Sequence, residues 1–346
     1  MVKRVPNGKT ANLGGLVRVS ACAILAMGVL LAVAGALEWW VGVKAERTAD
    51  LVRPDMTDAG LARHRQDFET ARIVLVGLDK DVLPATAAGL GTTPARLRGQ
   101  IDANYPAVAK LLAEKDLIVP FAELGVSNLE RHQEQFQRAD ELPVTWLPGY
   151  ALAFLNLALA AAVIASGIVL LRSRAERTRR AAFGVVLAAS AILIVVSLAL
   201  EIPDKARNAQ TVLDSLVPTQ QVVDRTEASL ATARAASTEL DQRLFPDLAT
   251  ALGTTPLGFQ QALAREFPAI AVALTEIPGT LDHYDARVAI RTAGAPDLRT
   301  LKGLPVGTLG WFAPAFGLLL AMVAIGGVLA SRRTTPRSKS PDPAGT

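Results

Sequence analysis

Cysteine is nearly absent from this chain of 346 residues, in which Cys22 is the only one. A lone thiol forms no intramolecular disulfide, so each folded segment must be stabilised by a hydrophobic core. Histidine is also scarce. His64, His132 and His283 are the only three, and none has a second His or a Cys at metal-ligand spacing. The sequence therefore predicts no metal site and no cofactor.

The chain also lacks the short motifs that bind phosphates or activate a nucleophile. It contains no phosphate-binding loop, no Gly-x-Ser-x-Gly elbow and no dinucleotide fingerprint. His283, Tyr284 and Asp285 are consecutive, but consecutive side chains point in different directions, and the first half has no equivalent triplet. We therefore predict no catalytic residue and a protein that is not an enzyme.

Charged residues are missing from four apolar runs, at 19–37, 150–171, 181–200 and 311–330. Each run has the length of about 20 residues that a helix needs to cross the hydrocarbon core of a membrane. Because lipid offers backbone groups no hydrogen-bond partner, these runs should be transmembrane helices. The alternative is a set of buried helices in a soluble protein, which the length of the runs and the arginines at their ends disfavour.

The four runs also contain no ionisable residue of the kind that lines a transport path. The nearest are Glu38 and Glu201, just past the outer ends of the first and third runs. The runs contain instead small residues four positions apart, which let helices approach closely. These pairs are Gly28/Ala32, Ala158/Ala162, Ala162/Ser166 and Gly317/Ala321. The pattern favours helix packing over a pore.

Basic residues are concentrated in the short segments 1–18, 172–180 and 331–346, whereas the long segments 38–149 and 201–310 lean acidic. The positive-inside rule therefore places both termini and the middle segment in the cytoplasm and both long segments outside. The tryptophans agree, because they lie at the outer ends of the runs: Trp39, Trp40, Trp146 and Trp311. The net charge of +4 thus reflects topology and attraction to membrane lipid, with no nucleic-acid-binding surface.

One sequence of five residues, Leu-Gly-Thr-Thr-Pro, occurs at 90–94 and again at 252–256, an offset of 162 residues. Other identities recur at this offset, including Arg63 with Arg225, Arg72 with Arg234, Asp79 with Asp241, Pro84 with Pro246 and Pro106 with Pro268. Each half also begins and ends with an apolar run. We therefore predict two tandem copies of span, outer segment and span, related by a pseudo-axis along the membrane normal.

Helical patterns predict an all-α fold for both outer segments. Residues 218–252 have the composition of a long amphipathic helix. Residues 73–76, Ile-Val-Leu-Val, would alone suggest a strand, but they align with Ala-Ala-Ser-Thr at 235–238, so we prefer helix in both. Long helices should continue the first and third spans outward, and Pro84 and Pro246 should start a new turn or kink a helix.

The predicted organisation is therefore an all-α integral membrane protein with four transmembrane helices and two helical extracytoplasmic domains. In chain order it comprises a cytoplasmic tail at 1–18, a span at 19–37, an outer domain at 38–149, a span at 150–171, a cytoplasmic loop at 172–180, a span at 181–200, an outer domain at 201–310, a span at 311–330 and a disordered cytoplasmic tail at 331–346. Because the first run is longer than the apolar region of a signal peptide, we expect it to be retained as an anchor.

The shared sequence at 90–94 and 252–256 predicts a helix-to-helix corner. Gly91 and Gly253 should end one helix in the left-handed conformation, and Thr93 and Thr255 should cap the next through their hydroxyls. A small anion held at the new helix N-terminus is the alternative, which we disfavour. A second corner at Tyr105-Pro106 and Phe267-Pro268 should lead into a short helix that ends near Glu114 and Glu276.

After the second corner the copies diverge. Residues 128–141 predict a polar helix capped by Asn128, and residues 290–303, which contain Gly and Pro, predict a loop. The surrounding segments 115–141 and 277–303 are therefore the predicted contact surface. Arg72 and Asp79, like Arg234 and Asp241, are seven residues apart and form either a polar ligand site or contacts to a neighbouring helix, and we favour the contacts.

These features predict a non-enzymatic multi-pass protein of the plasma (inner) membrane. Its outer domains should bind an extracytoplasmic protein, a lipid or a wall component. The sequence leaves open a homo-oligomer, and the alternative function is a channel or transporter component with a path between the repeats or in an oligomer. The composition, rich in Ala and Arg and poor in Lys, is typical of high-GC bacteria.

Overall fold

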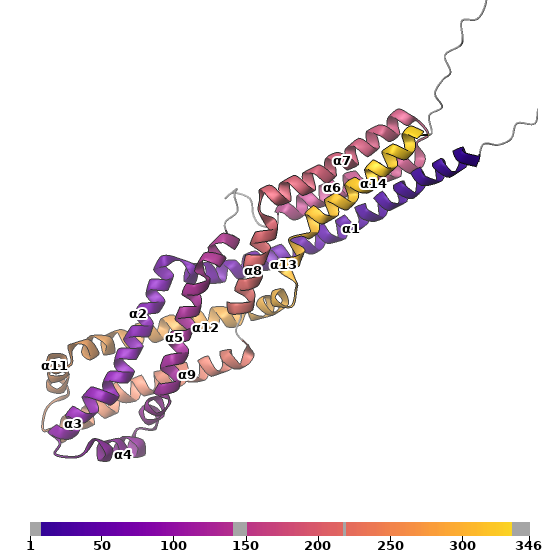
Figure 1. Cartoon of the computed structure of the whole chain (residues 1–346). Coiled ribbons are helices and arrows are strands. Elements are labelled where there is room, and N and C mark those ends of the chain that lie inside the picture. Colours follow the sequence, from indigo (N-terminus) through magenta and orange to yellow (C-terminus); the bar gives the residue numbers. More distant parts are fainter. Residues whose placement is uncertain (1–7, 141–150, 217–218, 334–346) are drawn as a thin grey trace, which may run out of the picture. The chain divides into compact units, whose positions relative to one another are not determined.

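The computed structural model describes residues 8–140, 151–216 and 219–333, and every regular element in these ranges is a helix (Figure 1). They contain no strand, which confirms the predicted all-α chain. The predicted tail beyond residue 333 and the segment 141–150 lie outside the described residues. The chain divides into two compact units. The span unit is Met1–Arg47, Arg138–Gln210 and Gly303–Thr346, and the polar unit is Thr48–Gln137 and Thr211–Lys302.

Four helices of the span unit are long and apolar enough to cross a membrane. They are α1 (Gly8–Val52), α6 (Ala151–Arg172), α7 (Glu176–Ala199) and α14 (Phe312–Arg333). The four helices share one apolar cluster whose fully buried side chains include Ile24, Val163, Phe183 and Leu320. Other large apolar side chains on these helices, such as Val33, point outward, as lipid-facing residues do. The four predicted runs are therefore found as helices, and they indicate a membrane protein.

Glycines of the span unit lie where two helices meet. A Cβ at Gly28 would lie 2.6 Å from Cγ1 of Ile164 in α6, and a Cβ at Gly317 would lie 3.0 Å from the backbone oxygen of Ser190 in α7. Only glycine fits such close approaches without displacing the neighbouring helix. The two glycines that the sequence assigned to helix packing are thus confirmed in that role.

The third span does not continue outward as predicted. Helix α7 ends at Ala199, and α8 (Ile202–Leu216) begins after Glu201, which has a positive φ of 53°. The prediction was wrong here because Pro203 has no backbone N–H and its ring would clash with the carbonyl group four residues before it. Helix α1, which contains no proline, runs without a break from Gly8 to Val52.

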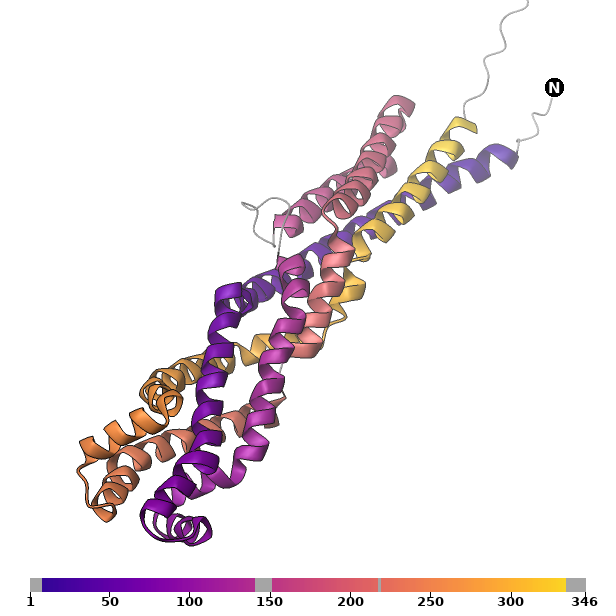
Figure 2. The same ribbon diagram turned by 60° about the vertical axis from the view of Figure 1, so that its left-hand side comes forward.

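The polar unit contains two series of helices whose bounds differ by 162 residues throughout. The first series is α2 (Asp58–Gly77), a π-helical turn (Leu78–Val82), α3 (Leu83–Gly89), α4 (Pro94–Asn104) and α5 (Pro106–Asp140). The second is α9 (Gln220–Glu239), a π-helical turn (Leu240–Leu244), α10 (Phe245–Ala251), α11 (Pro256–Glu266) and α12 (Pro268–Lys302). Figure 2 shows the short helices of both series at the same end of the long ones. Pro84 and Pro246 start a new helix, as predicted.

The two series share one hydrophobic core. Its buried side chains come from both, among them Leu78, Ile101 and Leu112 in the first and Leu240, Leu244 and Ile270 in the second. Segments that the sequence assigned to two outer domains thus contribute to one compact unit. The physical reason is that each series has an apolar face, and facing the other series covers that surface.

The Leu-Gly-Thr-Thr-Pro corners have the predicted geometry. Gly91 and Gly253 have φ angles of +64° and +69°. The Thr93 hydroxyl oxygen accepts a hydrogen bond from the Arg96 N–H at 3.3 Å, and Thr255 accepts one from the Gly258 N–H at 3.0 Å. These bonds satisfy N–H groups that the first turn of a helix leaves without a partner. The corners are therefore helix caps.

We expect Gly91→Ala to lower the free energy of unfolding by about 1 kcal/mol, because an L-residue pays a steric penalty at positive φ. The matched control is Gly99→Ala in the middle of α4, where an added Cβ meets no atom within 4 Å. The control should raise stability by about 0.5 kcal/mol, because alanine favours helix over glycine. Urea unfolding of both variants in detergent, followed by far-ultraviolet circular dichroism, measures the difference. Equal effects would contradict the capping role.

Two predictions about the ends of the copies were wrong. The short helices expected to end near Glu114 and Glu276 continue without interruption in α5 and α12. Asn128 is inside α5 and donates its side-chain N–H to the backbone oxygen of Ser215, so it is not a cap. Residues 290–302 are helical, because α12 buries Leu298 and Leu301 in this part and keeps Pro296 within the helix.

Candidate functional site

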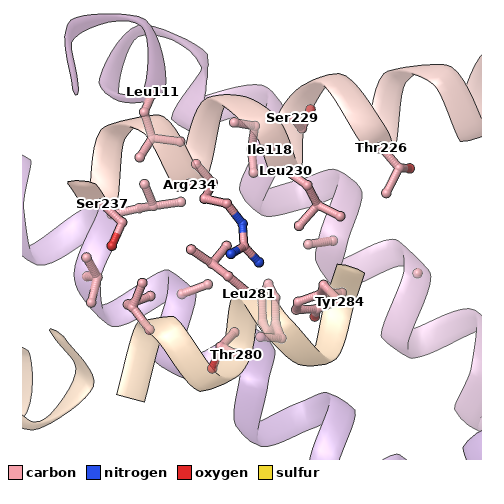
Figure 3. Close-up of a pocket in the computed structure, with 18 of the residues that line it drawn as sticks. Leu111, Ile118, Thr226, Ser229, Leu230, Arg234, Ser237, Thr280, Leu281 and Tyr284 are labelled. Atoms are coloured by element: carbon pink, nitrogen blue, oxygen red, sulfur yellow. The ribbon is translucent and has the colours of Figure 1, made fainter. Parts of the chain in front are cut away.

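A cavity of about 1280 Å³ opens in the polar unit, lined mainly by α2, α5, α9 and α12 (Figure 3). Pockets for small ligands usually measure roughly 300–1,000 Å³, so this one has room for a larger molecule. Most of its lining is apolar, with Leu111, Ile118, Leu230 and Leu281 among the residues labelled in Figure 3. The cavity is therefore the candidate functional site.

Helices α5 and α9 flank the cavity and run antiparallel. At one end, the backbone N–H groups of Ala107 and Val108 donate to Glu239 Oε2 at 2.9 and 3.0 Å. Further along, the guanidinium of Arg225 lies over the ring of Phe121, 5.6 Å from its centre. Between these two contacts the side chains facing the cavity are mainly small or apolar. The two helices are thus joined at separate points and leave the space between them open.

Arg234 lies at the centre of the view in Figure 3, where it extends from α9 toward Leu281 and Tyr284 of α12. Its guanidinium forms ion pairs with Asp282, at 2.9 Å, and with Asp285. Burial and the negative charge of Asp67 raise the pKa of Tyr284 to about 12. The phenol therefore keeps its proton at neutral pH and is available as a hydrogen-bond donor in the cavity wall.

The Arg and Asp residues that recur at the offset, Arg72 with Asp79 and Arg234 with Asp241, do not pair with each other. Asp79 binds Arg98 of α4 at 2.7 Å and Lys115 of α5 at 3.1 Å. Arg234 binds α12, as described, and Arg72 binds Glu69 within α2. Contacts to a neighbouring helix, the favoured interpretation, are thus found for Asp79 and Arg234, while Arg72 stays within its own helix. Arg234 and Asp241 also line the cavity.

A buried polar cluster joins α2 to α12 beside the cavity. Its centre is Asp67, whose side chain is 2 % exposed. Asp67 Oδ2 accepts a hydrogen bond from His283 Nδ1 at 2.5 Å, and Oδ1 accepts one from the Thr280 hydroxyl at 3.2 Å. Arg63 adds an ion pair at 3.3 Å. A buried carboxylate requires such partners, because burying an unpaired charge is strongly unfavourable.

A second acid–histidine pair completes the cluster. His64 Nε2 lies 3.0 Å from Asp55 Oδ1, and the rings of His64 and His283 are 5.3 Å apart. Arg287 Nε lies 2.9 Å from Asp55 Oδ1 and 3.3 Å from His283 Nε2. Because a guanidinium N–H only donates, His283 Nε2 must accept, and the ring proton is on Nδ1, facing Asp67. His64 and Arg287 also line the cavity.

No motif in the sequence predicts this cluster. His283, Tyr284 and Asp285 do point to different partners, as expected, namely Asp67, the cavity and Arg234. The contact between His283 and Asp67, however, joins residues 216 positions apart. His132 takes no part, since its Nδ1 lies 2.9 Å from the backbone oxygen of Asn128 in the same helix. In the described part of the chain, no three His, Cys, Asp or Glu side chains are placed to hold a metal ion.

The cavity and the cluster occupy corresponding places in the two series. At the offset of 162 residues, His64, Asp67, His283 and Arg287 correspond to Thr226, Ser229, Phe121 and Gly125. All four of these counterparts line the cavity. The contact between α2 and α12 is thus filled by a polar cluster, whereas the corresponding space between α5 and α9 is open.

The predicted contact segments supply much of this lining. Leu117, Phe121 and Leu124 come from 115–141, and Leu281 and Tyr284 come from 277–303. Leu124, which lines the opening, is 71 % exposed. Both predicted contact segments therefore face the cavity. No protein-family model matches this chain, and no curated protein sequence matches it either.

Proposed function

We propose that this chain is a non-enzymatic, multi-pass protein of the bacterial plasma membrane whose polar unit lies outside the cell and binds a lipid. The observation that carries the proposal is the cavity of about 1280 Å³ with its mainly apolar lining. Apolar surface left in water costs about 25 cal/mol per Å². An apolar chain bound in the cavity would cover this surface.

The arrangement of the copies supports a binding role. We propose that the two halves are tandem repeats, on the basis of the shared sequence and the element bounds that recur at 162 residues. The contact between α2 and α12 is then closed by Asp67 and His283, while the corresponding contact between α9 and α5 has Ser229 and Phe121 and leaves a space. Loss of the cluster residues is a simple way to open a ligand cavity in a duplicated scaffold.

Binding is favoured over catalysis by the state of the buried histidines. His283 has both ring nitrogens in contact with Asp67 and Arg287, and His64 faces Asp55 through Nε2. A general base needs a free nitrogen within reach of the proton that it removes. The sequence left open a lipid and a wall component as ligands, besides a protein. The apolar lining favours the lipid over a polar wall component.

We expect Gly125→Trp to weaken lipid binding by about tenfold or more, which corresponds to 1.4 kcal/mol. Gly125 lines the cavity, and an added Cβ meets no atom within 4 Å, so the indole enters open space without displacing a helix. The measurement is titration of the purified full chain with a fluorescent long-chain fatty acid.

Gly279→Trp in α12 is the control, because this glycine is also free of neighbours within 4 Å but does not line the cavity. It should bind the fatty acid as the parent does. The proposal fails if the parent shows no saturable binding, or if the two tryptophan variants behave alike.

Placement of the polar unit outside the cell predicts a labelling pattern. In a Cys22→Ser background, Gln100→Cys and Gln261→Cys, both at exposed positions, should react with a membrane-impermeant maleimide in intact cells. Arg177→Cys, in the first turn of α7 and within the basic segment 172–180, should react only after the membrane is permeabilised. Protection of residue 100 or 261 in intact cells would overturn this topology.

A further inference from the structure

We infer that the lipid is an anionic amphiphile whose headgroup is bound by Arg225 and Arg291 and whose tail extends toward Leu240. This inference rests on the proposed lipid-binding function and adds the charge of the ligand and its direction in the cavity. The observations that carry it are the distribution of charge along the cavity and the pairing of the charged groups.

The register of α9 and α12 brings the two arginines to the same end of the cavity. The helices run antiparallel, since Arg234 contacts Asp282, Thr292 donates to Glu227 at 3.2 Å, and Arg299 donates to Gln220. In this register Arg225 of α9 lies opposite Gly294 of α12, which is about one helical turn from Arg291. Both arginines line the cavity.

Among the described residues, these two guanidinium groups are the cations of the cavity wall that form no ion pair. Arg234 is paired with Asp282 and Asp285, and Arg287 is paired with Asp55. Within the described residues, Arg225 and Arg291 have no carboxylate within 4.0 Å, and Arg225 lies over the ring of Phe121. Lys302 and Asp214, which also line the cavity, each have a partner of their own.

The acidic groups near this end are already engaged. Asp55, which attracts Arg291, also binds His64 and Arg287. Glu227 accepts from Thr292 and does not line the cavity. Asp282 is held by Arg234, and Asp241, the remaining acid of the wall, lies at the far end of α9. An anion therefore meets two available guanidinium groups, which bind phosphate and carboxylate oxygens in a fixed fork geometry.

The opposite end of the cavity is apolar and long enough for a tail. Its lining there includes Leu75, Leu111, Leu240, Phe245 and Leu263. From Arg225 to Leu240 the helical rise amounts to about 22 Å. One acyl chain covers half of a hydrocarbon core about 30 Å thick, or roughly 15 Å. A single chain therefore fits along α9 when its headgroup lies at the arginines.

The test measures the affinity of the full chain, in a non-ionic detergent, for two lysolipids with the same acyl chain. One is the anionic lysophosphatidylglycerol and the other is the zwitterionic lysophosphatidylcholine, each titrated at concentrations that do not saturate the protein. We expect the anionic lipid to bind the parent about tenfold more tightly, with an advantage that shrinks as salt is added. Arg225→Gln/Arg291→Gln should remove this advantage and leave binding of lysophosphatidylcholine within about twofold. A fatty carboxylate of the same length, run in parallel, distinguishes a carboxylate from a phosphate headgroup.

The control is Arg265→Gln in α11, which removes a cation that is 80 % exposed and outside the cavity. It should preserve the preference for the anionic lipid. The headgroup assignment is wrong if the parent binds both lysolipids equally. It is also wrong if the double variant no longer binds either lysolipid while Arg265→Gln still binds both. In the first case saturable binding that is sensitive to Gly125→Trp would still support lipid binding. If no lipid binds the parent, the proposed function itself fails.

Discussion

Asp67→Ala is expected to lower the free energy of unfolding of the polar unit by about 3 kcal/mol. Removing one partner of a buried ion pair typically costs about 3–5 kcal/mol, because the remaining groups stay buried without compensation. Here the substitution leaves the Nδ1–H of His283 and the hydroxyl of Thr280 without their acceptor, in a site where Asp67 is 2 % exposed. Asp67→Asn, which keeps one acceptor oxygen, should cost less.

The measurement is hydrogen–deuterium exchange of α2 and α12 in the full chain, since exchange of buried amides reports the stability of the helices that the cluster joins. Asp116→Ala is the control, because this acid is 86 % exposed and its ion pair with Lys115 is 3.5 Å long. A surface pair of this kind contributes about 0–1 kcal/mol. If Asp67→Ala exchanges like Asp116→Ala, the cluster does not hold α2 against α12.

Local features of the fold could be predicted from the sequence because their causes lie within a few residues. The four spans follow from uninterrupted apolar runs, and α1, α6, α7 and α14 coincide with them. The corners at Gly91 and Gly253 follow from the conformational freedom of glycine and the hydroxyl of the following threonines. In both cases the pattern alone determines the local structure.

Errors occurred where tertiary packing outweighs local preference. Residues 290–302 contain Gly294 and Pro296, which suggest a loop, yet α12 continues because Leu298 and Leu301 are buried. Gly294 is needed there, since a Cβ would lie 2.6 Å from Cδ1 of Leu51. At Glu201 the third span was predicted to continue outward as a helix, whereas α7 ends at Ala199, before Pro203. The alignment at the offset of 162 residues predicted helix at 73–76 correctly, since α2 contains this segment.

The candidate site was the least predictable part. Asp67 and His283 are far apart in the sequence, and neither has a counterpart of its own kind at the offset of 162, where Ser229 and Phe121 stand. Identity at this offset does not mark the site, since Arg225, which matches Arg63, and Arg234, which matches Arg72, also line the cavity. The residues that differ line the cavity on one side and fill the cluster on the other. The cluster could not be predicted because Asp67 and His283 come into contact only when α2 packs against α12.

Gly327→Leu is expected to destabilise the span unit by about 2–3 kcal/mol, since overfilling a closely packed core forces side chains and backbone apart. A Cβ at Gly327 of α14 would lie 2.3 Å from Cε1 of Phe183 in α7, and Phe183 is fully buried. The ring has little room to move, because it packs within the apolar cluster that all four spanning helices share. Helices α7 and α14 should therefore separate or shift.

The adjacent Gly326→Leu is the matched control, because it makes the same change in the same turn of α14. Gly326 is exposed, and an added Cβ meets no atom within 4 Å, so its leucine should face lipid and leave α7 in place. Both variants also gain about the same helix propensity over glycine, so this term cancels between them. Thermal unfolding in detergent, followed by circular dichroism, should give a lower midpoint for Gly327→Leu than for Gly326→Leu. Equal midpoints would mean that α7 and α14 are not in contact at Phe183. A lower midpoint for Gly326→Leu would place the opposite face of α14 against its neighbour.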